Sequence, residues 1–375
     1  MSIPSDYLWY IPNQVEAGHR GDTAREGHNS LDVLTTQALA LEHHGWRGAL
    51  LGAGWGRPDT FTVATALAAR TTVFEPLIAI RPGYWRPANF ASAAATLDHL
   101  SGGRLRVNIV SGQDDLAAYG DTQGDQAHRY GRTKEFMRLV RRLWTEERVT
   151  WAGNHFQVAG STVLPRIAPS GDRLHPRLYF GGASAAAEQV SATEADVQLF
   201  WGEPLDGIAE RIDRLKALSA TLDRDLPPLQ FGLRITTLVR DTTEQAWADA
   251  EAKVAHMAEQ AGLDRDHRRF AAVGQQRLLD LHERGDVLDD NLYTTPGKFG
   301  GGGAGTTWLV GSAKDVARSL LKYQALGITH FVLSDTPYLA EIERQGEQLL
   351  PLLRHRSVAP SLALASGESP VWSPV

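Results

Sequence analysis

The sequence predicts an α/β protein that folds as a closed (β/α)8 TIM barrel. Short apolar runs alternate with amphipathic helical stretches along the chain, which is typical of βα units and a parallel sheet. Eight such runs are candidate strands, near residues 7–12, 48–51, 72–80, 105–110, 177–180, 197–201, 230–239 and 329–334. A doubly wound open sheet is the competing topology. It would need a glycine-rich turn directly after the first strand, where this sequence has Ile11-Pro12-Asn13-Gln14.

The stretches between these strands carry helical periodicity. It is clear over 31–44, 206–222 and 243–261, whereas 121–147 and 316–326 are helical at least in part. The gap between the seventh and eighth strands, about 241–327, is far longer than an ordinary βα connection. We therefore expect an inserted helical segment there, followed by an irregular loop.

That loop, about 285–307, contains the glycine run from Gly300 to Gly303. Glycines have many backbone states and no side chains to anchor them, so the loop is predicted to be mobile. At the carboxyl face of a barrel, a long mobile loop is often a lid over the active site. A lid is our prediction, and a plain flexible connection is the alternative.

The domain organisation that follows is one barrel domain over 1–356, with a tail at 357–375 rich in Ser, Pro and Ala. The tail is expected to be loosely ordered or to reach a partner subunit. The chain has 375 residues, 42% of them hydrophobic and 22% charged, which is enough apolar material for a large core.

Composition excludes several classes of function. The net charge is -6 and the Lys and Arg residues are scattered, which argues against nucleic acid as a partner. The chain has no Cys, which excludes disulfides, thiolate nucleophiles and Cys-ligated metals. The 13 His residues form no metal-spaced cluster. No apolar run is long enough to span a membrane, and the first residues lack a secretory pattern, so we expect a cytoplasmic protein.

Two segments place polar residues where barrels hold their chemistry, at the carboxyl ends of strands. Asn108 lies inside the fourth strand, with Ser111 just beyond it. A buried Asn needs a hydrogen-bond partner, which a ligand or the neighbouring backbone could supply. Gly181-Gly182-Ala183-Ser184 follows the fifth strand and begins a helix. Free N–H groups at a helix start suit a phosphate, although an ordinary helix cap has the same pattern.

Two further residues could belong either to the active site or to the structural core. Trp201 ends the sixth strand, where an aromatic ring either lines a pocket or packs in the core. Arg234 lies within the seventh strand and needs a partner if it faces inward, either an anionic ligand or a structural carboxylate. In contrast, Arg104 is expected to pair with an acid such as Asp98 in a structural role.

An ordered series of segments over about residues 5–355 resembles the reduced-FMN-dependent alkanesulfonate monooxygenases, a branch of the bacterial-luciferase-like flavin enzymes. The segments are 94–104 (AATLDHLSGGR), 107–112 (VNIVSG), 128–130 (HRY), 178–184 (LYFGGAS), 201–204 (WGEP), 274–277 (GQQR) and 302–306 (GGAGT). The segment 81–87 (RPGYWRP) is closer to the dimethyl-sulfone monooxygenases.

The resemblance implies a set of cofactor-binding residues. They are Asn108 and Ser111 near the flavin ring, and His128, Tyr130, Gly182, Ala183 and Ser184 around the FMN phosphate. It implies that Arg234 and Trp201 are catalytic. It also implies that a separate NAD(P)H-dependent flavin reductase supplies reduced FMN, that O2 is the co-substrate, and that the chain forms a homodimer or homotetramer.

The substrate implied is a small organosulfur compound, with cleavage of a sulfonate C–S bond to an aldehyde and sulfite. Its binding residues would be Trp9, Gln14, Arg57, Thr236, Thr336 and Tyr338. Several of these depart from the sulfonate pattern. Gln14 and Thr236 replace histidines, Arg57 replaces a cysteine, Thr336 replaces a tyrosine, and Gly301 replaces an arginine in the expected lid. Arg57, Arg81 or Arg86 would have to compensate as anion ligands.

These departures keep three alternatives open. One is a monooxygenase for a sulfone or a sulfur-free substrate. Another is an oxidoreductase that uses coenzyme F420, because the superfamily includes hydride-transfer enzymes. The third is a catalytically silent flavin-binding subunit. The absence of an evident Ser-His-Asp set or carboxylate pair fits an enzyme whose cofactor performs the difficult chemistry.

Overall fold

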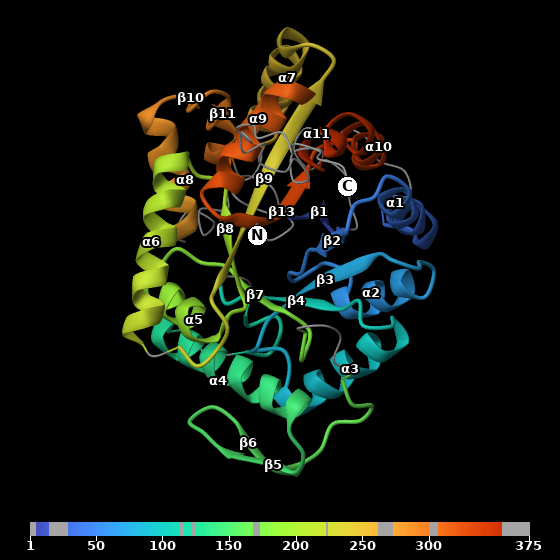
Figure 1. Ribbon diagram of the computed structural model, residues 1–375, viewed down its shortest axis with the longest axis vertical. Helices are drawn as coiled ribbons and strands as arrows, with labels where there is room; N and C mark the ends of the chain where they lie inside the picture. The colour runs from blue at the N-terminus through green and yellow to red at the C-terminus, as the bar shows by residue number, and fades with distance from the viewer. Residues whose placement is uncertain are drawn as a thin grey trace, which may run out of the picture.

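Eight parallel strands close into a barrel in the computed structural model, which describes residues 5–14, 29–112, 116–121, 125–167, 173–222, 224–261, 273–299 and 307–354. In order around the barrel the strands are β1 (Asp6–Ile11), β2 (Gly48–Leu51), β3 (Glu75–Ile80), β4 (Arg106–Ile109), β7 (Leu178–Phe180), β8 (Val197–Trp201), β9 (Gln230–Arg240) and β13 (Ile328–Ser334). Pairing of β13 with β1 completes the closure (Figure 1). The predicted fold class is confirmed, and each expected strand is present.

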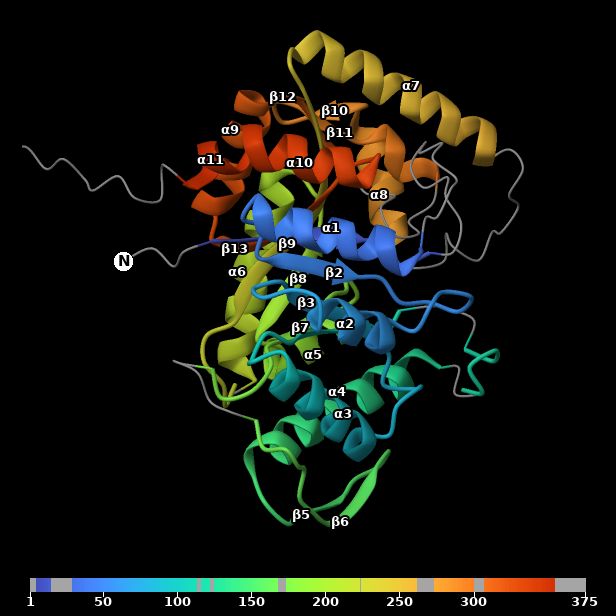
Figure 2. The same cartoon turned by 90° about the vertical axis from the view of Figure 1, so that its right-hand side faces the viewer.

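Helices surround the barrel (Figures 1 and 2). They are α1 (Leu31–His43), α2 (Thr60–Ala68), α3 (Pro87–Leu100), α4 (Gln126–Thr145), α5 (Ala185–Glu194), α6 (Leu205–Thr221), α9 (Ala313–Ala325), α10 (Tyr338–Gln348) and the short α11 (Leu350–Arg354). Several begin where a side chain accepts an orphan N–H of the first turn, as Ser30 does for α1 and Asp125 for α4. The helix starts are therefore encoded locally.

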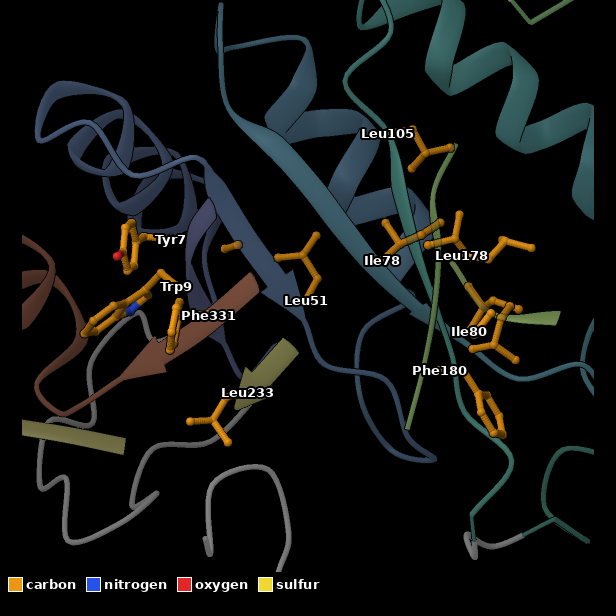
Figure 3. Close-up of a cluster of buried hydrophobic side chains, with 14 of the residues drawn as sticks. Tyr7, Trp9, Leu51, Ile78, Ile80, Leu105, Leu178, Phe180, Leu233 and Phe331 are labelled. Carbon is orange, nitrogen blue, oxygen red and sulfur yellow. The ribbon is translucent and has the colours of Figure 1, made fainter. Parts of the chain in front are cut away.

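Alternation along the strands divides the core into two layers. Outward-facing residues such as Trp9, Ile78 and Leu233 pack against the helices and form the outer core (Figure 3). Inward-facing residues such as Leu8, Tyr10 and Leu199 form a smaller cluster inside the barrel. Because successive side chains of a strand point to opposite faces, Trp9 and Tyr10 belong to different layers. Any residue that acts in the barrel lumen must share the orientation of Tyr10.

The segment between β9 and β13 builds a small sheet onto the barrel. It contains α7 (Thr243–Ala261), α8 (Val273–Arg284), β10 (Val287–Leu288), β11 (Leu292–Tyr293), the 3-10 helix η3 (Thr295–Phe299) and β12 (Trp308–Ser312). β9 continues past the barrel, and its residues Thr236 to Arg240 pair in parallel with β12. Thus β9 belongs to both the barrel and the added sheet.

The inserted helices are present as expected, whereas the first part of the predicted irregular loop has regular structure. Residues 285–299 form β10, β11 and η3, with Thr295, Pro296 and Gly297 buried. Backbone pairing orders this stretch despite its weak apolar pattern. The glycine run at 300–306 lies outside the described residues, and so does the tail at 357–375.

A second unpredicted element is the hairpin of β5 (Val149–Ala152) and β6 (Gln157–Ser161). It lies at the end of the molecule opposite α7 (Figures 1 and 2). The carboxylate of Glu135 in α4 holds it by accepting the indole N–H of Trp151 at 2.9 Å and two backbone N–H groups. No helix in the described ranges has the length and apolar character that crossing a bilayer requires.

The expected Arg104–Asp98 pair is wrong. The guanidinium of Arg104 donates to backbone carbonyls, including that of Phe74 at 2.7 Å and that of Ala68 at 2.8 Å. Asp98 pairs instead with Arg173 and accepts the backbone N–H of Leu105. Asp98 and Arg173 are 75 residues apart in the chain, so their pairing depends on the closed barrel.

Candidate active site

The carboxyl ends of the barrel strands bring together an arginine and two aromatic residues. Arg234 of β9 lies beside Trp201 of β8, because the two are register partners. The guanidinium carbon of Arg234 is 4.0 Å from the ring centroid of Tyr10, a distance at which a cation–π interaction is strong. Trp201 and Arg234 are both half-buried and share the orientation of the inward-facing residues of their strands. Tyr10 was not anticipated from the sequence.

Arg57 approaches the same residues from the loop after β2. Its Nη1 donates to the carbonyl of Pro12 at 2.6 Å. A Cβ placed on Gly52 would lie 3.0 Å from the hydroxyl of Tyr10 and 3.1 Å from Nη1 of Arg57, so both groups flank this glycine. Two guanidinium groups, Arg57 and Arg234, are therefore next to the same tyrosine.

The turn after β7, residues 181–184, packs closely on the first turn of α5 and is called the cradle below. A Cβ on Gly182 would overlap that of Ala187, so only glycine fits there, and it would lie 3.9 Å from the hydroxyl of Tyr130 in α4. Ser184 is the N-cap of α5, and its hydroxyl accepts the N–H of Ala187 at 3.2 Å. The two predicted phosphate segments, far apart in sequence, thus meet at one place.

Asn108 and Ser111 lie on the neighbouring strand end. Asn108 faces inward from β4 and is 9% exposed. Within the described part of the chain, its side-chain oxygen Oδ1 is buried and has no hydrogen-bond partner. Ser111 is hydrogen-bonded to Thr133 of α4. An orphaned amide oxygen inside a barrel mouth is a group that a ligand with N–H donors can satisfy.

The remaining predicted residues are divided between the mouth and the outer core. Gln14 is half-buried at the end of β1, and buried Thr236 pairs in register with Ser334. Thr336, just beyond β13, is fully buried, and its carbonyl accepts a hydrogen bond from Lys253 at 2.6 Å. These three lie at strand ends around the mouth.

In contrast, Trp9 and Tyr338 lie in the outer core. Trp9 packs edge-on against Trp46, with ring centroids 5.0 Å apart, and faces away from the lumen because of its position in the strand alternation. Tyr338 is the first residue of α10 and is buried. Trp9 thus lies apart from the mouth residues, whereas Tyr338 is two residues beyond Thr336, and a substrate role for either residue stays a prediction.

His128 lies in the first turn of α4, and its ring meets that of His155 from the hairpin, with centroids 4.6 Å apart. His128 and Tyr130 are two residues apart, which places them on different faces of a helix. Burial lowers the pKa of His155, an effect that nearby Glu135 opposes. His128 therefore points away from the cradle, whereas Tyr130 lies next to it.

Glu203 of the segment 201–204 and Arg277 of the segment 274–277 form an ion pair with each other. Nε of Arg277 in α8 is 3.1 Å from a carboxylate oxygen of Glu203 just after β8. Glu203 is 4% exposed and also binds Arg211 of α6 at 2.8 Å. Across the described residues, no group of three or more His, Asp or Glu side chains is placed to hold a metal ion.

A closed parallel barrel with polar and charged side chains at the carboxyl ends of its strands is typical of TIM-barrel enzymes. The model of the family described as luciferase-like monooxygenase matches residues 6–330. The chain therefore belongs to the luciferase-like monooxygenase family.

Solved structures with the same fold come from several branches. An EDTA monooxygenase from Chelativorans sp. BNC1 is 16% identical, with 96% of this chain and 95% of that chain covered and a TM-score of 0.75. A riboflavin lyase with modified FMN is 20% identical, with 96% and 93% covered and a TM-score of 0.73. An F420-dependent secondary alcohol dehydrogenase is 16% identical, with 94% and 100% covered and a TM-score of 0.68.

Proposed function

We propose that this chain is the oxygenating component of a two-component flavin monooxygenase that acts on a small organosulfur substrate, with a sulfonate as the preferred class. The observation that carries the proposal is the cradle at Gly182, next to Tyr130, one strand away from the orphaned amide oxygen of Asn108. The phosphate of FMN would bind in the cradle, and an N–H group of the flavin ring would donate a hydrogen bond to the side-chain oxygen of Asn108.

The residues fit FMN in specific roles. The backbone of Gly182 and Ala183 and the first turn of α5 would bind the phosphate, because unsatisfied N–H groups at a helix start favour an anion. Tyr130 would add a hydroxyl donor. Asn108 would orient the ring, with Ser111 beside it. When bound, reduced FMN supplies the two electrons that allow O2 to oxidise a substrate carbon next to sulfur.

The substrate would bind at the N–H edge of the Arg234 guanidinium, next to Trp201. A guanidinium binds a sulfonate well because its N–H donors form a planar fork. Arg57, which flanks Gly52 together with the hydroxyl of Tyr10, would compensate for the histidines and cysteine that are replaced in this chain. A sulfonate oxidised here would yield an aldehyde and sulfite. An NAD(P)H-dependent flavin reductase is the expected partner, because the reductant must be delivered to this site.

The proposal is tested by mixing the anaerobic protein and reduced FMN with oxygenated buffer in a stopped-flow instrument. The reaction is run with a panel of sulfonates and sulfones, and sulfite is assayed. We expect substrate-dependent sulfite release, and a loss of at least tenfold in kcat/KM for Arg234→Met because the anion loses a charged donor. A Lys216→Met variant, on the outer surface of α6, serves as the control.

Other outcomes would redirect the proposal. Oxygen consumption that depends on protein and substrate but releases no sulfite would contradict the sulfonate and point to a sulfone or a sulfur-free compound. Tight binding of coenzyme F420 without oxygen consumption would overturn the monooxygenase, an outcome that the shared fold of the F420-dependent dehydrogenase makes worth including.

A further inference from the structure

Arg211 of α6 lies directly behind the Gly182 cradle and is only 2% exposed. Its three donor nitrogens each have a different acceptor. Nη2 donates to the carbonyl of Gly182 at 2.7 Å, Nη1 to Glu203 at 2.8 Å, and Nε to Glu188 at 3.2 Å. The guanidinium also stacks on Phe200, 4.7 Å from the ring centroid. The side chain is therefore held in one orientation.

The hydrogen bond from Arg211 to the carbonyl of Gly182 also fixes the direction of the next N–H group, that of Ala183. The carbonyl of Gly182 and the N–H of Ala183 belong to one planar peptide group, and in a trans peptide they point in opposite directions. Because Arg211 draws the oxygen toward α6, the N–H of Ala183 must point away from α6. Gln198, which is fully buried, donates to the same carbonyl at 3.3 Å and favours the same orientation.

We propose that Arg211 is a positioning residue that aims the Ala183 N–H at the phosphate of FMN. This inference rests on the proposed function, since it requires the cradle to bind that phosphate. A charge-assisted hydrogen bond to the carbonyl also polarises the peptide, which makes its N–H a better donor. Arg211 itself stays behind the turn and does not touch the cofactor.

Direct attraction between Arg211 and the phosphate is not needed for this role. Glu188 and Glu203 lie against the guanidinium at hydrogen-bond distance and offset its charge. Burial raises the pKa of Glu188, but the hydrogen bond from Arg214 and the charge of Arg211 lower it by more. The net shift of the pKa is downward, so this carboxylate is ionised at neutral pH. What Arg211 contributes to the cradle is therefore orientation.

The test compares the binding of FMN with that of riboflavin, which lacks the phosphate, by quenching of flavin fluorescence with the full-length protein. For Arg211→Met we expect the dissociation constant of FMN to rise about tenfold while that of riboflavin stays the same. Arg214→Met is the matched control. Arg214 binds the same Glu188 but makes no contact with Gly182, so the FMN-to-riboflavin ratio should not change.

A second variant guards against loss of folding, because Arg211→Met leaves two buried carboxylates without this partner. Arg211→Lys keeps a positive charge near both but cannot supply three donors in a fixed fork, so it should show the same loss of FMN preference. If both Arg211 variants keep the wild-type ratio, the positioning role is overturned. If the wild-type protein itself does not prefer FMN over riboflavin, the proposed cradle fails instead.

Discussion

Tyr10 combines two features that suit an anion site. Its ring is 2% exposed and carries the guanidinium of Arg234 on its face, while its hydroxyl flanks Gly52 together with Arg57. Stacking uses the face of a guanidinium, whereas anions are bound by the N–H groups at its edge. The two interactions do not compete. The Tyr10 ring can therefore hold Arg234 in place while the N–H edge of the guanidinium binds a substrate.

Replacing Tyr10 by Leu should therefore raise KM for the best sulfonate about two- to thirtyfold, since a buried cation–π contact contributes about 0.5–2 kcal/mol. Tyr10→Phe keeps the ring and should retain most of the affinity. The control is Trp9→Phe on the opposite face of β1, which should lower the melting temperature without changing KM. Steady-state kinetics and thermal unfolding of the three variants check this. Equal effects of Tyr10→Leu and Trp9→Phe on KM would contradict it.

The contrast between Trp9 and Tyr10 also shows where sequence reasoning stops at this scale. The first strand was placed correctly from its apolar run, yet Trp9 was chosen for the pocket, although Tyr10 faces the lumen. Both residues are apolar and adjacent in an all-buried strand, and such a strand has no polar alternation to reveal which face is inside. Only the closed barrel decides the face.

At the scale of elements, α7 and α10 are joined to the strand ends by buried charges. Lys253 of α7 donates to Asp335 at 2.9 Å, and Arg240 of β9 contacts Glu341 of α10 at 3.1 Å. Arg344 lies 3.4 Å from the same Glu341. Since Lys253 also holds the carbonyl of Thr336, this cluster fixes a mouth residue to the inserted helix.

Glu341 gives the cluster a pH dependence. Its pKa is raised from 4.5 to about 7, because the effects of burial and of the charge of Asp335 outweigh the opposing charges of Arg240, Lys253 and Arg344. A carboxyl with a higher pKa in the folded than in the unfolded chain binds its proton more tightly when folded. The stability that it contributes is present below about pH 4.5 and is lost as the pH rises toward 7.

We therefore expect the free energy of unfolding of the wild type to fall relative to that of Glu341→Gln between pH 5 and pH 7, by at most about 1.4 kcal/mol per pH unit. Urea unfolding of both proteins at pH 5, 6, 7 and 8 measures the difference, and Glu343→Gln on the same helix is the control. Parallel pH profiles for the wild type and Glu341→Gln would show that this carboxyl is already ionised at pH 5.

Elements were predictable where the pattern is long and periodic. All eight barrel strands and the long helices α1, α6 and α7 were found from their periodicity. The hairpin β5–β6 was missed because its strands are only four and five residues long and contain no continuous apolar run like those of the barrel strands. β12 was missed because it lies after a glycine run, and its pairing with the extended end of β9 is a tertiary contact that its own sequence does not specify.

For the whole molecule, the two ends of the barrel have different tasks. The amino-terminal end is closed by a buried network in which Arg106 pairs with Asp6 at 2.7 Å and donates to the hydroxyl of Tyr179 at 2.6 Å. That hydroxyl contacts His330 at 3.0 Å. Burial lowers the pKa of His330, although Asp6 opposes the shift, so the imidazole is neutral near pH 7.

The site at the other end draws on β1, β4, β7, β8 and β9, which no local pattern connects. Its residues were proposed from the family resemblance, and the fold brings most of them to one face. Arg211 was not singled out, because from sequence it is one charged residue on an amphipathic helix. Its role depends on a carbonyl 29 residues away. Backbone geometry of this kind has no signature in a single sequence.

The division of tasks between the ends makes a final prediction. Arg106→Met removes the buried guanidinium that Asp6 and Glu75 share, which should lower the free energy of unfolding by about 3 kcal/mol. Arg47→Met is the matched control. Arg47 pairs with the same Glu75 at 2.6 Å, but its side chain is 55% exposed, so the loss should be at most about 1 kcal/mol. Urea unfolding gives both values, and FMN binding at a temperature where all three proteins are folded should be the same for each, since the network lies at the opposite end of the strands from the cradle. A large loss of FMN affinity in Arg106→Met would mean that the two ends are coupled.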